Sequence, residues 1–356
     1  MGIFKREFIV VIVLSSKVRK YEVEEIKAAL DEAGLTYYEG KSIKLHFIMV
    51  NGSLDQSQIE YIRSLKGVEQ LIENHAPYPL ASRDVRDEST TFEVKGQVIG
   101  GDGINMVAGP CSVESREQIF QTAELLYELG FKFIRGGAYK PRTSPYSFQG
   151  LGREGLQMLR EAADAYDLGV VSEVIDYDVL DDLYDYADIL QVGSRNMFNY
   201  YLLKQLGKID KPILLKRGMF ASIKEWLLAA EYILNGGNDQ VILCERGVRT
   251  FDQEVRNQMD IAAIALVKGL SHLPVWADPS QGSGVKNLIE PLSKASIAAG
   301  AHGLMIETHP NPDNALSDGQ QSLNFDNFRN LIKNLIPLLE GLGKSFYLSA
   351  PNLTTN

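Results

Sequence analysis

The sequence predicts an α/β fold in which a TIM (β/α)8 barrel follows a small ferredoxin-like βαββαβ domain. Three observations support this prediction. The chain has 356 residues, 45% of them hydrophobic, which is enough for a large globular core. Its N-terminal part reads strand, helix, strand, strand, helix, strand. The rest contains eight short apolar runs separated by amphipathic segments, spread over about 250 residues, the usual size of a TIM barrel.

The N-terminal segments follow the ferredoxin-like order. We expect strands at residues 8–14, 36–39, 43–50 and 68–72, and helices at residues 22–33 and 55–65. The first helix has apolar residues at helical spacing and stops at Gly34. No His, Cys and carboxylate residues in this part have the spacing of a ligand cluster. We therefore expect a binding or regulatory module, with a purely structural appendage as the alternative.

The composition changes between the two parts. Residues 75–90 contain two prolines and charges of both signs, which is typical of a linker. We predict a ferredoxin-like regulatory domain at residues 1–76, a linker at residues 77–91 and a catalytic barrel at residues 92–356. The barrel part opens with a hairpin that turns at Lys95 and Gly96.

The apolar runs of the second part are the expected barrel strands. They cover residues 104–108, 131–135, 169–174, 189–193, 213–216, 241–244, 275–277 and 303–306. A doubly wound open sheet is the alternative, but that fold would call for a phosphate-binding glycine motif after its first strand. The sequence lacks such a motif there, so the barrel is preferred.

Charge and cysteine content exclude some classes of partner. Lys and Arg number 36 against 46 Asp and Glu, a net charge of −10, which disfavours nucleic acid and anionic membrane surfaces. No apolar run approaches the roughly 18 residues of a membrane span. The two cysteines are too few for a disulfide scaffold and fit a reducing compartment, so we expect a cytoplasmic protein. An anionic ligand would have to be held by a local cluster of cations.

Such a cluster follows from the residues at the ends of the expected strands. Active sites of TIM barrels lie at the carboxyl ends of the strands. The cations found there are Arg135, Lys140, Arg142, Arg195, Lys216, Arg217 and Arg246. Arg and Lys side chains are the usual means of holding phosphate. We therefore expect the site to bind two phosphate groups. The alternative for any single one of these cations is a solvent-exposed charge at a strand end that binds no ligand.

Three further residues at strand ends could hold a metal. Cys111, Glu307 and Asp318 form a mixed set of soft and hard ligands that suits a divalent transition metal such as Mn, Fe, Co or Zn. Spacing alone is weak support, and an inert buried Cys111 is the alternative.

Seven strings of the sequence resemble one known family. They are, in order, GPCSVES, IRGGAYKPRTSPYSFQGLG, SEV, ILQVGSRN, LLKRG, ILCERGVRTF and MIETHPNPDNALSDGQQSL. Together they are similar to 3-deoxy-D-arabino-heptulosonate 7-phosphate (DAHP) synthases, of the subfamily shared with 3-deoxy-D-manno-octulosonate 8-phosphate (KDO8P) synthases. The front domain is similar to the feedback-inhibition domain of some members. The resemblance implies a transferase of aromatic amino acid biosynthesis, with aromatic amino acids or a later pathway intermediate as effectors, and a homo-oligomer, dimer or tetramer.

The resemblance also implies roles for individual residues. Phosphoenolpyruvate would be held by Arg135, Lys140, Arg195, Lys216 and Arg246, with Glu173 close by. Erythrose 4-phosphate would meet Lys140, Pro141, Arg142 and Thr143, and the neighbouring Arg217. KDO8P synthases, which use arabinose 5-phosphate, usually carry an Asn-containing motif after the lysine, so the DAHP synthase interpretation is preferred.

In the family, a Cys, a His, a Glu and an Asp bind the metal. These fall here on Cys111, position 281, Glu307 and Asp318, and position 281 is Gln. An amide offers only a carbonyl oxygen, so Gln281 should weaken metal binding and shift the preference from Zn or Fe toward Mn or Mg. A low-activity or sensor form is the corresponding alternative.

The implied reaction is an aldol-like condensation that releases phosphate. Lys140 could donate a proton, and His309 could be a proton relay or a hydrogen-bonded structural histidine. A Schiff-base aldolase with Lys140 or Lys216 as nucleophile is a rival interpretation.

Overall fold

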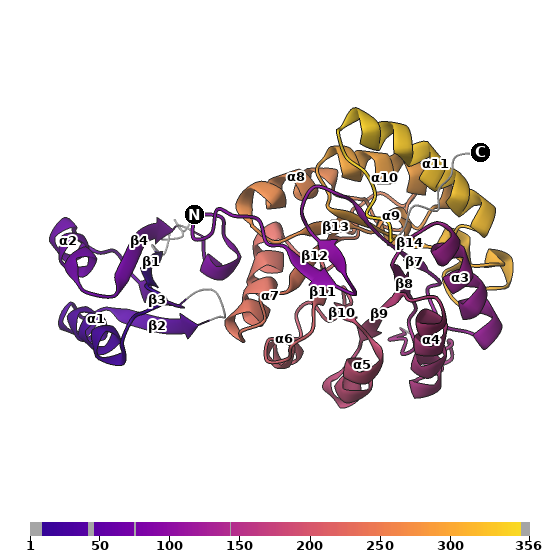
Figure 1. Ribbon diagram of the computed structural model, residues 1–356. Helices are drawn as coiled ribbons and strands as arrows, with labels where there is room; N and C mark the ends of the chain where they lie inside the picture. The colour runs from indigo at the N-terminus through magenta and orange to yellow at the C-terminus, as the bar shows by residue number, and fades with distance from the viewer. Residues whose placement is uncertain (1–8, 42–45, 75, 143, 350–356) are drawn as a thin grey trace.

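The computed structural model describes residues 9–41, 46–74, 76–142 and 144–349. Figure 1 shows a small N-terminal sheet with two helices beside a larger ring of strands and helices. The helices of the small domain lie on the side of its sheet that faces away from the ring.

The N-terminal domain has the predicted βαββαβ order. Its elements are β1 (Ile9–Leu14), α1 (Lys20–Glu32), β2 (Thr36–Lys41), β3 (His46–Asn51), α2 (Gln56–Ser64) and β4 (Val68–Asn74). The sheet is antiparallel in the order β2-β3-β1-β4. Ile12 and Ile48 pack with Ile26 and Leu30 of α1 on one face, which is why this helix forms despite its charged outer side. Val11 on the other face belongs to the core cluster of the barrel.

A hairpin and a short 3-10 helix connect the two parts. The 3-10 helix is η1 (Pro79–Ala81), and the hairpin pairs β5 (Phe92–Val94) with β6 (Gln97–Ile99). Lys95 and Gly96 turn the hairpin with φ of 52° and 74°, the left-handed pair that a tight two-residue turn requires. The hairpin therefore lies where the sequence predicts it, while the domain boundaries at 76 and 91 stay a prediction.

Eight parallel strands close into a barrel, as predicted. They are β7 (Asn105–Gly109), β8 (Phe133–Arg135), β9 (Gly169–Val174), β10 (Ile189–Val192), β11 (Ile213–Lys216), β12 (Val241–Glu245), β13 (Val275–Ala277) and β14 (Gly303–Glu307). The covering helices are α3 (Arg116–Glu128), α4 (Arg153–Ala165), α5 (Leu180–Tyr186), α6 (Tyr200–Leu206), α7 (Ile223–Asn235), α8 (Ile261–Leu270), α10 (Ile289–Ala298) and α11 (Phe325–Gly341), with the short α9 (Pro279–Ser283) after β13. The open-sheet alternative is excluded because β14 pairs with β7.

The hairpin closes one end of the barrel. Val94 and Ile99 belong to the same buried cluster as Phe133, Trp276 and Met305 from the barrel strands. Apolar side chains thus fill the amino-terminal end of the barrel, and polar residues at the carboxyl ends of the strands are left to form the opposite mouth.

The N-terminal domain contacts the barrel through α7. The Tyr38 hydroxyl donates a hydrogen bond to Asn235 Oδ1 at 2.9 Å. Glu231 of α7 accepts hydrogen bonds from the backbone N–H groups of Leu80 (2.9 Å) and Ala81 (3.0 Å) in η1. Burial, only partly offset by these two bonds, raises the pKa of Glu231 to about 8. The half-buried Glu231 thus fastens the connecting segment to the barrel.

Within the described ranges, no helix is long and apolar enough to cross a membrane.

Candidate active site

A cavity of about 320 Å³ lies at the carboxyl ends of the barrel strands. It is polar because the turns after the strands carry the charged residues that the sequence analysis singled out. The predicted residues that line it are Cys111, Arg135, Lys140, Pro141, Arg142, Glu173, Arg195, Lys216, Arg246, Gln281 and Asp318. The barrel thus brings together residues from both ends of the catalytic part of the chain.

The end of β7 is shaped by Gly109. Its φ is 148°, and a Cβ there would lie 2.1 Å from the carbonyl oxygen of Arg135. Only glycine permits this close approach of β7 to β8. The approach places Cys111 beside Lys140, whose Nζ donates to the Cys111 carbonyl oxygen at 3.0 Å and contacts Sγ at 3.2 Å.

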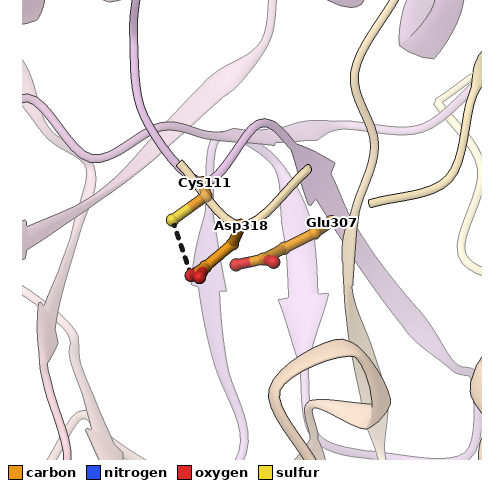
Figure 2. A group of neighbouring side chains, drawn as sticks. All are labelled: Cys111, Glu307 and Asp318. Carbon is orange, nitrogen blue, oxygen red and sulfur yellow. Dashed lines mark hydrogen bonds between the residues drawn. The ribbon is translucent and has the colours of Figure 1, made fainter. Parts of the chain in front are cut away.

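Cys111, Glu307 and Asp318 gather at this point, as Figure 2 shows. One ligand atom from each lies within 4.8 Å of the others. The Cys111 thiol donates a hydrogen bond to Asp318 Oδ2 at 3.2 Å. Burial raises the pKa of the Cys111 thiol, and nearby Lys140 offsets this only in part. The three side chains could hold a divalent ion, a thiolate and two carboxylates being suitable ligands.

The fourth predicted ligand, Gln281, does not offer its oxygen to this cluster. Gln281 Oε1 accepts a hydrogen bond from Arg246 at 2.9 Å, while Nε2 donates to Glu307 Oε1 at 2.8 Å and to Asp318 Oδ2 at 3.2 Å. An amide nitrogen is a donor only and cannot ligate a metal. Gln281 therefore does not fit as the fourth ligand of a metal site. Cys111, Glu307 and Asp318 do fit as ligands.

Two of the inner cations are paired with carboxylates. Arg135 contacts Glu307 at 2.8 Å, and Lys216 contacts Asp278 at 2.5 Å. Burial alone would raise the pKa of Asp278, but Lys216 and Arg135 hold it below its ordinary value. Burial alone would likewise lower the pKa of Arg135, but Glu307 raises it. The charges deep in the mouth are therefore balanced by the protein itself.

Other cations lack such compensation. Arg142 Nη2 and Arg246 Nη1 are buried nitrogens without a hydrogen-bond partner among the described residues. Burial lowers the pKa of Arg246, with only partial compensation from Asp278. Arg195 is exposed at the edge of the cavity. Buried donors are almost always satisfied, so these two guanidinium nitrogens are exceptions among the residues that line the cavity.

Glu173 of β9 lies on the wall of the cavity, next to β10. Gln191 Nε2 donates to its Oε2 at 3.3 Å. A Cβ at Gly193 would lie 2.0 Å from Glu173 Oε1, so this glycine makes room for the carboxylate. Glu173 is half-buried and lines the cavity.

Three predicted residues are not among those that line the cavity. Arg217 turns away and pairs with Glu245 (3.0 Å) and Asp260 (2.9 Å), which makes it a buried structural ion pair. His309 Nδ1 accepts from the N–H of Asn311, so its other nitrogen, 3.3 Å from Glu114, carries the proton. Glu307 lies behind the wall and contacts Arg135 and Gln281. Thr143 lies outside the described residues.

The loops after β7 and β14, the first and last strands of the barrel, are joined by several contacts. Ser112 and Ser317 share a hydrogen bond of 2.7 Å between their hydroxyl groups. Glu114 accepts from the N–H of Leu316 at 2.9 Å. We call this pair of loops the seam, because it fixes Asp318 next to Cys111 although the two are 207 positions apart.

Three residues of the site were not predicted from the sequence. Asp278 balances Lys216, Arg256 contacts Asp318 at 3.3 Å, and Gln321 Nε2 donates to Glu307 Oε2 at 2.7 Å. Asp278 and Gln321 stand inside the expected strand-end motifs and could have been found there. Arg256 comes eleven positions after the end of β12, and no pattern points to it.

The chain is similar to one protein family and to several known proteins. The model of the DAHP synthetase I family matches residues 84–339. A phospho-2-dehydro-3-deoxyheptonate aldolase of Thermotoga maritima is 44% identical over 94% of this chain and 98% of its own length. A 2-dehydro-3-deoxyphosphooctonate aldolase of Francisella tularensis is 30% identical over 70% of this chain and 97% of its own.

Two solved structures are similar to this chain over most of its length. That of the Thermotoga maritima DAHP synthase covers 95% of this chain and 99% of its own, with a TM-score of 0.77 and 44% identity. A truncated form of the Thermotoga maritima enzyme covers 75% of this chain and 99% of its own, with a TM-score of 0.71 and 47% identity.

Proposed function

The chain belongs to the DAHP synthetase I family, and on that basis we propose that it condenses phosphoenolpyruvate with erythrose 4-phosphate to give DAHP and inorganic phosphate. One observation of the site carries the proposal: Arg142 and Arg246 line the same cavity, and each has a buried guanidinium nitrogen without a hydrogen-bond partner among the described residues. They come from the loops after β8 and β12 and so offer two separate places for anionic groups.

Phosphoenolpyruvate binds in the inner part of the cavity. Arg135, Lys140, Lys216 and Arg246 surround this part, and Arg195 closes its edge. Erythrose 4-phosphate enters from the side of Pro141 and Arg142. Arg217 is not part of this proposal because its guanidinium group is held by Glu245 and Asp260.

The residues of the cavity supply the proton transfers. C3 of phosphoenolpyruvate forms a bond to the aldehyde carbon of erythrose 4-phosphate, and Lys140 gives a proton to the aldehyde oxygen. Water adds at C2 and Glu173 takes one proton from that water. The bond between C2 and the phosphate oxygen then breaks, and the departing phosphate takes the remaining proton of the C2 hydroxyl, which leaves the ketone. The cations hold both substrates in line and stabilise the charge that develops.

A divalent ion would be held here by Cys111, Glu307 and Asp318. Among the metals considered above, Mn²⁺ suits the two carboxylate oxygens best. Such an ion would supply Lewis-acid polarisation of the aldehyde. It would bind weakly, because it would compete with the hydrogen bonds that Gln281 donates to Glu307 and Asp318.

The function is tested by phosphate release from phosphoenolpyruvate with either erythrose 4-phosphate or arabinose 5-phosphate. We expect a clear preference for the four-carbon sugar. In the same assay Arg142→Ala should raise the KM for erythrose 4-phosphate by about tenfold or more, since a charge-assisted contact to phosphate is lost. The KM for phosphoenolpyruvate should change little.

Arg63→Ala, a change in α2 of the N-terminal domain, serves as the control. A rise in the KM for phosphoenolpyruvate alone would refute the role of Arg142. A preference for arabinose 5-phosphate would replace the proposal with a KDO8P synthase.

We also propose that residues 1–76 inhibit the barrel when an effector binds. A second cavity, of about 1070 Å³, lies between the N-terminal domain, the linker and the barrel. Its lining has charges of both signs, including Lys27, Glu39 and Arg86, and apolar residues such as Val13 and Leu80. Such a lining suits an aromatic amino acid or a later intermediate of the pathway.

Deleting residues 1–90 should keep turnover and abolish inhibition by these effectors. The truncated Thermotoga maritima structure indicates that such a barrel folds by itself. The measurement compares inhibition curves of the full and shortened chains for each aromatic amino acid, with circular dichroism as the check on folding. A shortened chain that is equally sensitive would contradict the regulatory role.

We place the enzyme in the cytoplasm as a homo-oligomer. The two cysteines are buried and free, as in a reducing compartment. Tyr146 and Phe251, on loops around the mouth, are 97% and 98% exposed, and large exposed aromatic side chains are typical of surfaces that meet a partner.

A further inference from the structure

The side chain of Gln281 lies between a guanidinium group and two carboxylates. Its backbone N–H donates to Asp278 Oδ1 at 2.9 Å, which fixes the residue in the first turn of α9. Its Oε1 faces Arg246, and its Nε2 faces Glu307 and Asp318. The amide is therefore held on all sides.

This orientation cannot be reversed. Turning the amide over would place Oε1 against two carboxylate oxygens and Nε2 against the Arg246 guanidinium, so acceptors would face acceptors and donors would face donors. Each mismatched buried group would carry its desolvation cost. Arg246 thus directs the only ligating atom of Gln281 away from Glu307 and Asp318.

Nitrogen donors also surround the rest of the cluster. Glu307 accepts from Arg135 and Gln321, besides Gln281. Asp318 accepts from Arg256 at 3.3 Å and from the Cys111 thiol. Lys140 Nζ lies 3.2 Å from Cys111 Sγ. The two carboxylates are therefore held together by donors and cations of the protein, which is the structural task that a divalent ion would perform.

We propose that the amide of Gln281 takes the place of the ion, so that the site keeps its geometry and the condensation proceeds without a divalent metal. This inference rests on the proposed function. The reaction balances as before: the new C–C bond forms, the aldehyde oxygen takes its proton from Lys140, water adds at C2 and phosphate leaves. Gln281 is a positioning residue that acts through Glu307 and Asp318.

The experiment uses the full chain and two readouts, binding of Mn²⁺ by titration calorimetry and phosphate release with chelator or with Mn²⁺. We expect the wild-type protein to turn over at the same rate in both conditions. Gln281→His, which restores an imidazole, should bind Mn²⁺ at least about tenfold more tightly than wild type. Gln121→His, an exposed change in α3, is the matched control.

A second variant keeps the test decisive if Gln281→His does not fold. Gln281→Glu adds a third carboxylate and removes the amide donor, so its thermal unfolding temperature should rise on addition of Mn²⁺ by clearly more than that of wild type.

The outcomes separate the two proposals. Wild-type turnover that the chelator abolishes and Mn²⁺ restores would overturn the metal-free inference and leave the function intact. Equal Mn²⁺ affinity of wild type and Gln281→His would overturn the inference whether or not the enzyme turns over. Absence of phosphate release under every condition would refute the function, while the binding data would still decide the role of Gln281.

Discussion

We expect Lys140→Met to lower turnover by roughly 10²–10⁴-fold, the usual contribution of a positioned proton donor. Lys140 is buried, and its Nζ lies within 3.2 Å of both the carbonyl oxygen and the Sγ of Cys111, on the wall of the cavity. Methionine keeps most of the packing and removes the proton and the charge. The loss should appear mainly in kcat, because Arg135, Lys216 and Arg246 still hold phosphoenolpyruvate.

Phosphate release as a function of both substrates is the measurement, with the exposed Lys208→Met as control. Unchanged kcat in Lys140→Met would remove this residue from the chemistry. Borohydride with both substrates provides a further check: a covalent adduct on Lys140 or Lys216 would identify a Schiff-base aldolase instead.

The second large effect concerns stability and pH. The pKa of Glu231 rises from 4.5 to about 8 through burial, so the folded protein keeps a proton that the unfolded chain releases between these values. The free energy of unfolding should therefore fall as pH increases across this window, by up to about 1.4 kcal/mol per unit. The stabilisation from protonated Glu231 is fully present below the pKa of the unfolded chain. It is lost as the pH rises through the pKa of the folded protein.

Glu231→Gln has no such proton, so its unfolding should lack this part of the pH dependence. Urea unfolding of both proteins across the window, with the exposed Glu124→Gln as control, measures the difference. Parallel pH profiles for wild type and Glu231→Gln would show that this carboxyl group does not control the connection between domain and barrel.

Much of the fold was predictable because its patterns are local. The Val-rich and Ile-rich runs of the barrel are buried on both faces, so each appears as a short continuous apolar segment. Ser115 and Ser222, which cap α3 and α7, mark where helices begin. The turn at Lys95 and Gly96 could also be predicted, because a two-residue hairpin needs left-handed residues there.

The site was less predictable because it depends on the direction of side chains. Arg217 follows Lys216 directly, yet neighbouring residues at a strand end point to opposite sides. Lys216 therefore enters the cavity, whereas Arg217 pairs with Glu245 behind it. The cations were also expected to need bound anions, but Glu307 and Asp278 compensate two of them. The direction of the Gln281 amide depends on Arg246, which is distant in sequence.

The seam has a consequence for how the protein is made. Domains fold as units as the chain leaves the ribosome, the N-terminal one first. The ferredoxin-like domain has all its strands by Asn74, whereas Cys111 must wait for Glu307 and Asp318, and β7 for its partner β14. A nascent chain therefore acquires its proposed control domain early and gains activity only when the last strand and the loop behind it have emerged.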